Sequence, residues 1–276
     1  MSAPSLLLLI PAYNEEARIE PVLREYADFF ARNFTGHFQL VVVLNGCRDN
    51  TLGVVQRVAK DFSSVSWLDF PAPIGKGGAL IEGLKLAQHG EFIGYVDADG
   101  ATGPQAFLDL LQHVGDADCV IGSRWLPDSV LIQKQPGFRR FVSRCFHVIV
   151  ELFFWLHVKD TQCPCKLIRS EAVEKIHPNL CIADLAFDVN LLVCLKRAGF
   201  KIREVPIAWT DMAGSKVSAS LFRSSLAMFL SVLRVRLIYS PFYKWLRWLG
   251  PLEGWVYKKL RAPKPLSSSQ RQSTEK

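Results

Sequence analysis

The sequence predicts an α/β fold with a mostly parallel sheet and helices on both of its faces. Strand-like and helix-like segments alternate through the first half of the 276-residue chain, an order that is typical of parallel sheets with crossover helices. The strand-like segments are continuous apolar runs, as expected where helices cover both sheet faces. Polar or glycine-rich stretches follow four of these runs, and sheets of this kind bind ligands beyond the carboxyl ends of their strands.

The first four elements follow from their residue patterns. Ser5–Ile10 is a short aliphatic run closed by a proline, which favours a buried strand. Ala17–Phe30 carries apolar residues at helical spacing. Phe38–Leu44 is rich in β-branched residues and predicts a strand. Asn50–Lys60 predicts a helix, with Asn50 as its N-cap.

The alternation continues to residue 123. Val65–Leu68 and Phe92–Val96 are apolar strands, and Gly77–His89 is a helix with its apolar residues on one side. Pro104–Val114 is a helix with proline in its first turn. Cys119–Ser123 is a further strand.

The second half is less regular. Phe138–Val158 predicts a helix that is strongly apolar along one side, and a segment without a clear pattern follows it. Two helices, near Glu171–Ile176 and over Asp184–Arg197, precede a strand over Lys201–Val205.

Charge is unevenly distributed along the chain. The formal net charge is +7, but residues 217–276 hold 11 Lys and Arg against 2 Asp and Glu, whereas residues 1–216 hold 22 against 24. Apolar, aromatic and cationic residues interleave in Val217–Trp255, as in a helix at a membrane interface; the alternative is a helix packed on the protein's own core. The expected organisation is a catalytic domain over 1–216, amphipathic membrane-interface helices over 217–262 and a disordered tail over 263–276.

Several classes are disfavoured by the sequence. Seven scattered Cys argue against a secreted disulfide scaffold and for a reduced, cytosolic setting. The N-terminus has no signal-peptide pattern, and no run reaches the ~18 apolar residues of a membrane span. A neutral body without a nucleic-acid-binding motif argues against RNA or DNA as a partner. We therefore expect a cytoplasmic protein that associates peripherally with anionic membrane surfaces; its oligomeric state is not predicted.

Asp97-Ala98-Asp99-Gly100 follows an apolar strand and is the sharpest chemical signal. Residues i and i+2 of an extended segment point the same way, so Asp97 and Asp99 could converge on a hard cation that in turn holds a diphosphate. The alternative is a turn, for which Asp and Gly are also suited.

Two other strand-end loops leave alternatives open. Gly75-Lys76-Gly77-Gly78 lacks the spacing of a phosphate-binding Walker motif, because Phe70 stands where the first glycine belongs. Lys76 and free amide groups before a helix could still attract phosphate, or the loop is a flexible turn. Asp49 could bind a nucleobase or start a helix.

Taken in order, these motifs resemble those of the family 2 glycosyltransferases, whose sheet fold is called GT-A. They are particularly similar to those of the polyprenyl-phosphate sugar transferases, a group that includes the dolichyl-phosphate β-glucosyltransferases. The resemblance spans residues 10 to about 217. The resembling segments are Pro11-Ala12-Tyr13-Asn14-Glu15-Glu16, Gly75-Lys76-Gly77-Gly78-Ala79, Asp97-Ala98-Asp99-Gly100-Ala101-Thr102, Gly122-Ser123-Arg124, Asp160-Thr161-Gln162-Cys163, Ala186-Phe187-Asp188-Val189 and Trp209 with Gly214-Ser215-Lys216.

The resemblance implies roles for residues of these segments. Asp97 and Asp99 would hold the diphosphate of a nucleotide sugar through Mg²⁺ or Mn²⁺, and Ser123 and Arg124 would face the phosphate of the acceptor. Asn45 and Asn190 stand where relatives often have acidic residues. The residues expected to bind the nucleotide are Pro11, Ala12, Tyr13, Asn14, Glu15, Asn45, Asp49, Lys76 and Ala98.

The expected reaction is inverting transfer of a hexose, glucose by resemblance and UDP-glucose as donor, to a polyprenyl or dolichyl phosphate. The cation would offset charge on the departing nucleotide, and arginines would position the acceptor phosphate. Asp160 and Asp188 would orient the sugar or acceptor, or act as structural caps. Candidate arginines besides Arg124 are Arg139, Arg140 and Arg144, which could instead form a solvated helix end. The rivals are a soluble or polysaccharide acceptor and a non-catalytic module that binds nucleotide sugars at membranes.

Overall fold

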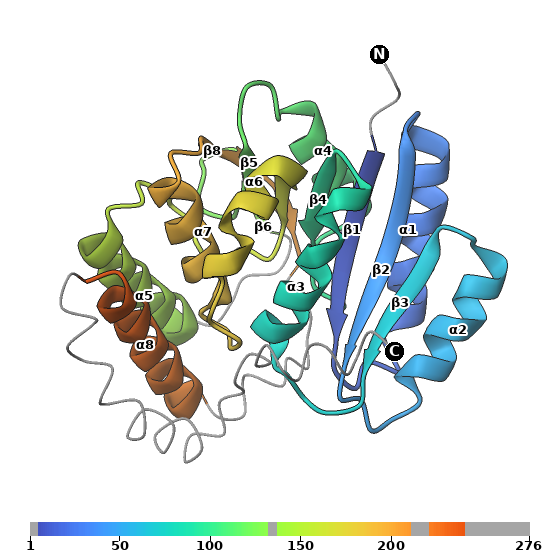
Figure 1. Cartoon of the computed structure of the whole chain (residues 1–276), viewed down its shortest axis with the longest axis horizontal. Helices are drawn as coiled ribbons and strands as arrows, with labels where there is room; N and C mark the ends of the chain where they lie inside the picture. The colour runs from blue at the N-terminus through green and yellow to red at the C-terminus, as the bar shows by residue number, and fades with distance from the viewer. Residues whose placement is uncertain (1–4, 132–136, 211–220, 241–276) are drawn as a thin grey trace.

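A seven-stranded sheet runs through the part of the chain that the computed structural model describes, residues 5–131, 137–210 and 221–240 (Figure 1). A separate two-stranded parallel pair lies beside it. The strands of the sheet are β1 (Ser5–Ala12), β2 (His37–Asn45), β3 (Val65–Phe70), β4 (Phe92–Tyr95), β5 (Cys119–Ser123), β7 (Lys166–Arg169) and β8 (Ile202–Pro206), and the pair consists of β6 (Val130–Leu131) and β9 (Ala208–Trp209).

The strand order is β3-β2-β1-β4-β7-β5-β8. β1 pairs in parallel with β2 and β4, β2 with β3, and β5 with β8, whereas β7 is antiparallel to both of its neighbours. The prediction of a mostly parallel α/β sheet is therefore confirmed, with one reversed strand near its middle.

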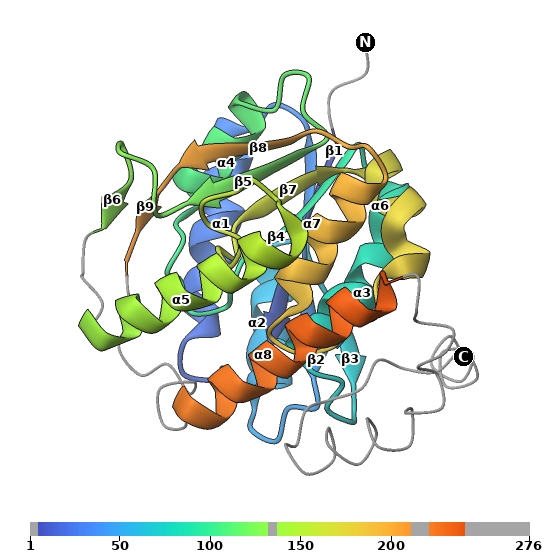
Figure 2. The same ribbon diagram turned by 90° about the vertical axis from the view of Figure 1, so that its left-hand side faces the viewer.

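Helices cover both faces of the sheet, as predicted (Figures 1 and 2). Leu6 and Leu8 of β1 join the core under α1, α2 and α4, and Leu7 and Leu9 join the core under α3, α6 and α7. Because side chains alternate along a strand, one continuous apolar run serves both cores. The helices are α1 (Ile19–Asn33), α2 (Thr51–Asp61), α3 (Lys76–Leu84), α4 (Pro104–Gln112), α5 (Gly137–Phe154), α6 (Ser170–Ile176), α7 (Phe187–Arg197) and α8 (Leu221–Ile238), with 3-10 turns η1 (Lys85–His89) and η2 (His177–Asn179).

The sequence patterns missed one strand of the main sheet. β7 has only two apolar residues, Leu167 and Ile168, between Lys166 and Arg169, so its polar ends hide the strand. The predicted helix over 77–89 continues past Leu84 as the 3-10 turn η1. Asn50 does precede α2, although its side chain makes no capping hydrogen bond.

α5 and α8 lie side by side on the α7 side of the fold (Figure 2). α8 buries Val232 and Val235 in the core beneath it, so this part of the basic C-terminal segment packs on the body. Other apolar side chains of the two helices stay exposed, among them Leu152 and Leu237. None of the helices in the described ranges combines the length and the apolar character that crossing a bilayer requires. The segments 241–262 and 263–276 of the predicted organisation lie outside the described residues.

Candidate active site

The loops after β1 and β2 are joined to each other at the carboxyl edge of the sheet. Asn14 Oδ1 accepts a hydrogen bond from the Arg48 amide at 2.7 Å, and Asn14 adopts a left-handed conformation with φ 55°. The Glu16 carboxylate accepts one from the Asn50 amide at 3.0 Å, and the Asp49 carboxylate accepts one from the Glu16 amide at 3.2 Å. These reciprocal bonds fix the two loops in which the predicted nucleotide-binding residues lie.

Asp49 also organises the first turn of α2. Its carboxylate accepts hydrogen bonds from the amide and the hydroxyl of Thr51. Partial burial alone would raise the pKa of Asp49, but the bonds from Thr51 and Glu16 hold that pKa below its usual value. In this structure Asp49 helps to start a helix, which is one of its two predicted roles. Contact of Asp49 with a nucleobase stays a prediction.

Asn45 shapes the glycine-rich loop before α3. It is buried, and its Oδ1 accepts hydrogen bonds from the amides of Ile74 at 2.7 Å and Gly75 at 3.1 Å. Gly75 has φ 82°, which favours glycine, and a Cβ on Gly77 would come within 2.5 Å of the Ile182 carbonyl oxygen. The glycines therefore serve a tight turn and close packing. An acid at position 45 could accept the same bonds, so the departure from the family pattern leaves the loop intact.

Asn190 plays an equivalent part on the other side of α3. Its Oδ1 accepts hydrogen bonds from the amides of Cys181 at 2.9 Å and Ile182 at 3.2 Å. This holds the segment before α7, whose Ala183 carbonyl accepts a bond from the Gly78 amide at 3.1 Å. Both asparagines that differ from the family pattern thus position loops around the N-terminus of α3.

Lys76 and Asp97 form an ion pair at this N-terminus. The Lys76 ammonium lies 2.6 Å from Asp97 Oδ1, and both side chains are a little under one-third exposed. Ala98 is buried in the core, whereas Asp97 and Asp99 on either side of it are partly exposed. Burial and the neighbouring charge of Asp97 raise the pKa of Asp99 above its usual value. Burial would lower the pKa of Lys76, but the carboxylates around it hold that pKa above its usual value.

The two strand-end carboxylates suit a hard divalent cation. Their oxygens are the ligands that Mg²⁺ and Mn²⁺ prefer, and a cation between them would offset the repulsion that raises the pKa of Asp99. Within the described ranges no cluster of three or more His, Cys, Asp or Glu could hold an ion by itself. A diphosphate could supply the further oxygens that such a cation requires.

We expect Asp99→Asn to stabilise the metal-free protein while abolishing its response to Mn²⁺. Because the fold raises the pKa of Asp99, ionised Asp99 destabilises the folded state above that pKa, and the neutral amide removes this cost. The gain should be at most about 1 kcal/mol at neutral pH, since the group is partly exposed. Urea denaturation measures the gain, and thermal unfolding with and without Mn²⁺ measures the response.

Acidification of the wild type is the companion measurement. Its affinity for Mn²⁺ should fall as the pH drops through the raised pKa of Asp99, hence at a higher pH than an ordinary Asp would produce. An equal rise in Tm with Mn²⁺ in wild type and variant would contradict the assignment.

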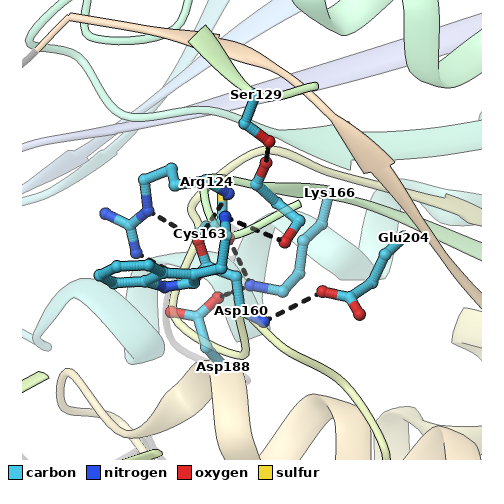
Figure 3. Close-up of polar contacts among 9 residues, drawn as sticks. Arg124, Ser129, Asp160, Cys163, Lys166, Asp188 and Glu204 are labelled. Carbon is cyan, nitrogen blue, oxygen red and sulfur yellow. Dashed lines mark hydrogen bonds and ion pairs between the residues drawn. The ribbon is translucent and has the colours of Figure 1, made fainter. Parts of the chain in front are cut away.

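Arg124 and Asp160 form a second, nearly buried ion pair (Figure 3). Arg124 Nε and Nη2 lie 2.7 and 2.9 Å from the two oxygens of Asp160, and the Arg124 amide donates to the same carboxylate at 3.0 Å. Burial would raise the pKa of Asp160, but Arg124 holds that pKa below its usual value. The Glu204 carboxylate accepts the amides of Lys159 and Asp160 and fixes this turn. Asp160 therefore acts in this structure by orienting Arg124.

Lys166 and Asp188 form a third pair, fully inside the protein (Figure 3). Lys166 Nζ donates to Asp188 Oδ1, which also accepts the hydroxyl of Tyr95 at 2.6 Å. Tyr95 and Lys166 are register partners on β4 and β7, so the antiparallel strand places both beside Asp188. The charge of Asp188 helps to raise the pKa of Lys76 and of Arg124, so Asp188 is electrostatically linked to the other two pairs. We call these three pairs the charged site.

Aromatic rings contact two of the arginines that are expected to bind the acceptor. The Arg124 guanidinium lies 5.0 Å from the centre of the Trp209 ring, and that of Arg144 lies 4.2 Å from the centre of the Trp125 ring. Stacked guanidinium groups keep donors free for a phosphate. Ser123 is buried, and its carbonyl accepts the Ser129 hydroxyl at 2.6 Å. The side chains of Arg139 and Arg140 lie outside the described residues.

Sequence reasoning missed Lys166, Tyr95 and Trp125. Lys166 is a cation inside a strand that was not predicted, and Tyr95 was assigned only to an apolar strand. Trp125 directly follows Arg124, but nothing in its neighbours signals a contact with Arg144. An aromatic residue next to a motif arginine is the one signal that could have been followed.

A mostly parallel sheet with a carboxylate pair and positioned cations at its carboxyl edge is typical of glycosyltransferases with a GT-A fold. The chain belongs to glycosyl transferase family 2, whose sequence model matches residues 8–177. It is similar to the dolichyl-phosphate beta-glucosyltransferase of Dictyostelium discoideum, with 32% identity over 246 residues that cover 85% of this chain and 74% of that protein. The Drosophila melanogaster protein of the same name is 33% identical over 233 residues, covering 78% and 71%.

Solved structures agree on the fold. Glucosyl-3-phosphoglycerate synthase from Mycobacterium tuberculosis, crystallised with Mn²⁺, UDP and glucosyl-3-phosphoglycerate, matches with a TM-score of 0.61 and 20% identity over 84% of this chain and 80% of its own. Mannosyl-3-phosphoglycerate synthase from Rubrobacter xylanophilus matches with a TM-score of 0.64 and 17% identity over 84% and 73%. The structures confirm the predicted fold class, and the family model and the relatives confirm the predicted enzyme class.

Proposed function

We propose that this glycosyltransferase moves glucose from UDP-glucose to a polyprenyl or dolichyl phosphate at the cytoplasmic face of a membrane. The observation that carries the proposal is the similarity to dolichyl-phosphate beta-glucosyltransferases over 85% of the chain. The ion pairs Lys76–Asp97 and Arg124–Asp160 support the proposal, because they supply carboxylates for a cation and an arginine for a phosphate.

On the donor side, Asp97 and Asp99 would hold Mg²⁺ or Mn²⁺, which supplies charge compensation for the departing diphosphate. Lys76 is already placed 2.6 Å from Asp97 and would turn to a diphosphate oxygen. The loop of Asn14 and Asp49 would receive the nucleoside. Crystals of the mycobacterial synthase with UDP and Mn²⁺ or Mg²⁺ support a divalent cation in this fold.

The reaction breaks the bond between the anomeric carbon and the diphosphate, which leaves with the electron pair. An oxygen of the acceptor phosphate attacks the opposite side of that carbon, so the configuration inverts. The acceptor is already an anion, so no strong general base is required. Arg124 and Arg144, each held by an aromatic ring, would position it. Asp160 takes part as a positioning residue through Arg124.

The membrane contact would come from the apolar side of α5 and from the basic C-terminal segment. Residues 217–276 carry 11 Lys and Arg, and each cation near an anionic surface adds roughly 1 kcal/mol of attraction. α8 supports the proposal because it packs on the body and still exposes Leu226 and Leu237.

The test incubates purified protein with radiolabelled nucleotide sugars, Mn²⁺ or Mg²⁺, and polyprenyl phosphate in detergent, followed by organic extraction. Label from UDP-glucose should enter the lipid phase, and alkaline hydrolysis should report the β-configuration. Parallel incubations with 3-phosphoglycerate and with polysaccharide test the soluble-acceptor alternative. Absence of label from the lipid with every common donor would refute the proposal.

Arg124→Lys should raise the KM for polyprenyl phosphate about tenfold while leaving the KM for the nucleotide sugar unchanged. Lysine has a single nitrogen and cannot reproduce the planar two-nitrogen contact with Asp160 while directing a further nitrogen at the acceptor. Initial-rate kinetics with each substrate varied in turn separates the two constants. Arg203→Lys, which alters an arginine paired with exposed Asp116, is the matched control and should change neither. Equal changes in the KM values for polyprenyl phosphate and for the nucleotide sugar would show that the substitution disturbs the whole site instead.

A further inference from the structure

A cavity of about 300 Å³ opens between the C-terminal parts of α5, α7 and α8. Three aromatic residues and three cations contribute to its lining. α7 begins at the charged site with Asp188 and carries two of these cations in its last turn, about 13 Å further along the helix. The cavity is therefore separate from the site of transfer. The six residues are Phe153, Phe154, Tyr239, Lys196, Arg197 and Arg236.

The cations of this cavity are available to an anion. Lys196, Arg197 and Arg236 are exposed, and no ion pair between described residues involves any of them. Lys196 Nζ donates to the Trp155 carbonyl, and the Arg197 guanidinium lies 4.7 Å from the centre of the Tyr239 ring. Neither contact neutralises charge, so an anionic ligand would gain the full attraction without displacing a carboxylate.

Three large apolar residues that are next in sequence to residues lining the cavity are exposed. Trp155 is 68% exposed, Leu152 67% and Leu237 45%. Cations at the C-terminal ends of α7 and α8 also suit the helix dipoles, but dipoles do not account for large apolar side chains left in water beside them. Aromatic and aliphatic groups beside Lys and Arg are typical of surfaces that enter a lipid interface.

We propose that this cavity binds the phosphate headgroup of an anionic phospholipid, with the first part of an acyl chain against Phe153 and Phe154. The proposal rests on the membrane association proposed above and adds a discrete lipid site apart from the acceptor. A free phosphate ion would bind the cations but leave the aromatic lining and the neighbouring exposed apolar side chains uncovered. The lipid uses both.

The experiment titrates the full chain with dihexanoyl phosphatidylglycerol, dihexanoyl phosphatidylcholine and inorganic phosphate below micelle-forming concentrations. We expect saturable 1:1 binding of phosphatidylglycerol alone. Arg197→Gln and Arg236→Gln should each weaken it about fivefold, and the double variant about 25-fold. Arg32→Gln on α1, a 78% exposed arginine on the other face of the sheet, is the matched control and should bind as wild type does. Thermal unfolding first verifies that each variant is folded.

Three results would overturn the proposal: equal binding by the double variant, equal binding of phosphatidylcholine, or inorganic phosphate binding as tightly as the lipid. Transfer in detergent is measured on the same variants and should be unchanged, because these residues lie outside the charged site. Failure of transfer in the wild type would refute the proposed function, whereas loss of the lipid titration alone would refute only this site.

Discussion

Asp97→Asn is expected to lower kcat for sugar transfer by about a thousandfold. The substitution removes one of two carboxylates that suit the divalent cation, and it replaces the 2.6 Å ion pair with Lys76 by at most a neutral hydrogen bond. A cation at a developing diphosphate charge stabilises the transition state by several kcal/mol, and about 4 kcal/mol corresponds to this factor. Single-turnover kinetics at saturating donor measures the chemical step directly.

The matched control is Asp69→Asn, an exposed aspartate on the edge strand β3, which should retain wild-type kcat. Raising the Mn²⁺ concentration should restore little activity in Asp97→Asn, because we expect Asp97 to orient the diphosphate as well as to bind the cation. Activity within a few-fold of wild type would show that the strand-end pair is a turn and not the cation site.

Lys166→Met is expected to lower the free energy of unfolding by about 3–5 kcal/mol, the usual cost of leaving a buried charge without its partner. Lys166 is 0% exposed and Asp188 4%, so water cannot replace the lost contact. The Tyr95 hydroxyl remains as a donor to Asp188 but brings no positive charge. Urea denaturation followed by circular dichroism gives the value.

A double-mutant cycle separates charge from packing. Adding Asp188→Asn to Lys166→Met removes the unpaired carboxylate and should recover a large part of the loss. Lys201→Met is the surface comparison, because it breaks the ion pair of Lys201 with Asp116, in which the two side chains are 56% and 66% exposed. It should lower the free energy of unfolding by less than about 1 kcal/mol. If Lys166→Met also lowered the free energy of unfolding by less than about 1 kcal/mol, the buried pair would contribute no more than the surface pair does.

The N-terminal half of the fold was predictable because its signals are local. Apolar runs and helical spacing each need only a window of a dozen residues, and the strands and helices up to Ser123 were placed within a few residues of their bounds. β7 was missed because two apolar residues cannot be told from a loop. Its identity as a strand depends on pairing with β4 and β5, which are distant in sequence.

The contrast between local signals and contacts of distant residues applies to the candidate site as well. Asp97 and Asp99 could be proposed from the sequence because two carboxylates after an apolar strand form a short pattern. The partners of Asp160 and Asp188 stand 36 and 22 residues away, and no periodicity links them. Burial of Lys166 could not be foreseen either, since lysine is rarely fully buried without a partner that only the fold reveals.

The reversed strand also sets the order in which the protein can assemble during synthesis. β1 to β4 pair with one another and are complete once residue 95 has left the ribosome. β5 at Cys119–Ser123 then has no place beside them, because β7 must lie between β4 and β5. The sheet remains in two pieces until residues 166–169 emerge and close the gap. The charged site also includes Asp188 of α7, so a nascent chain that stops short of residue 188 cannot complete that site even after the sheet has closed.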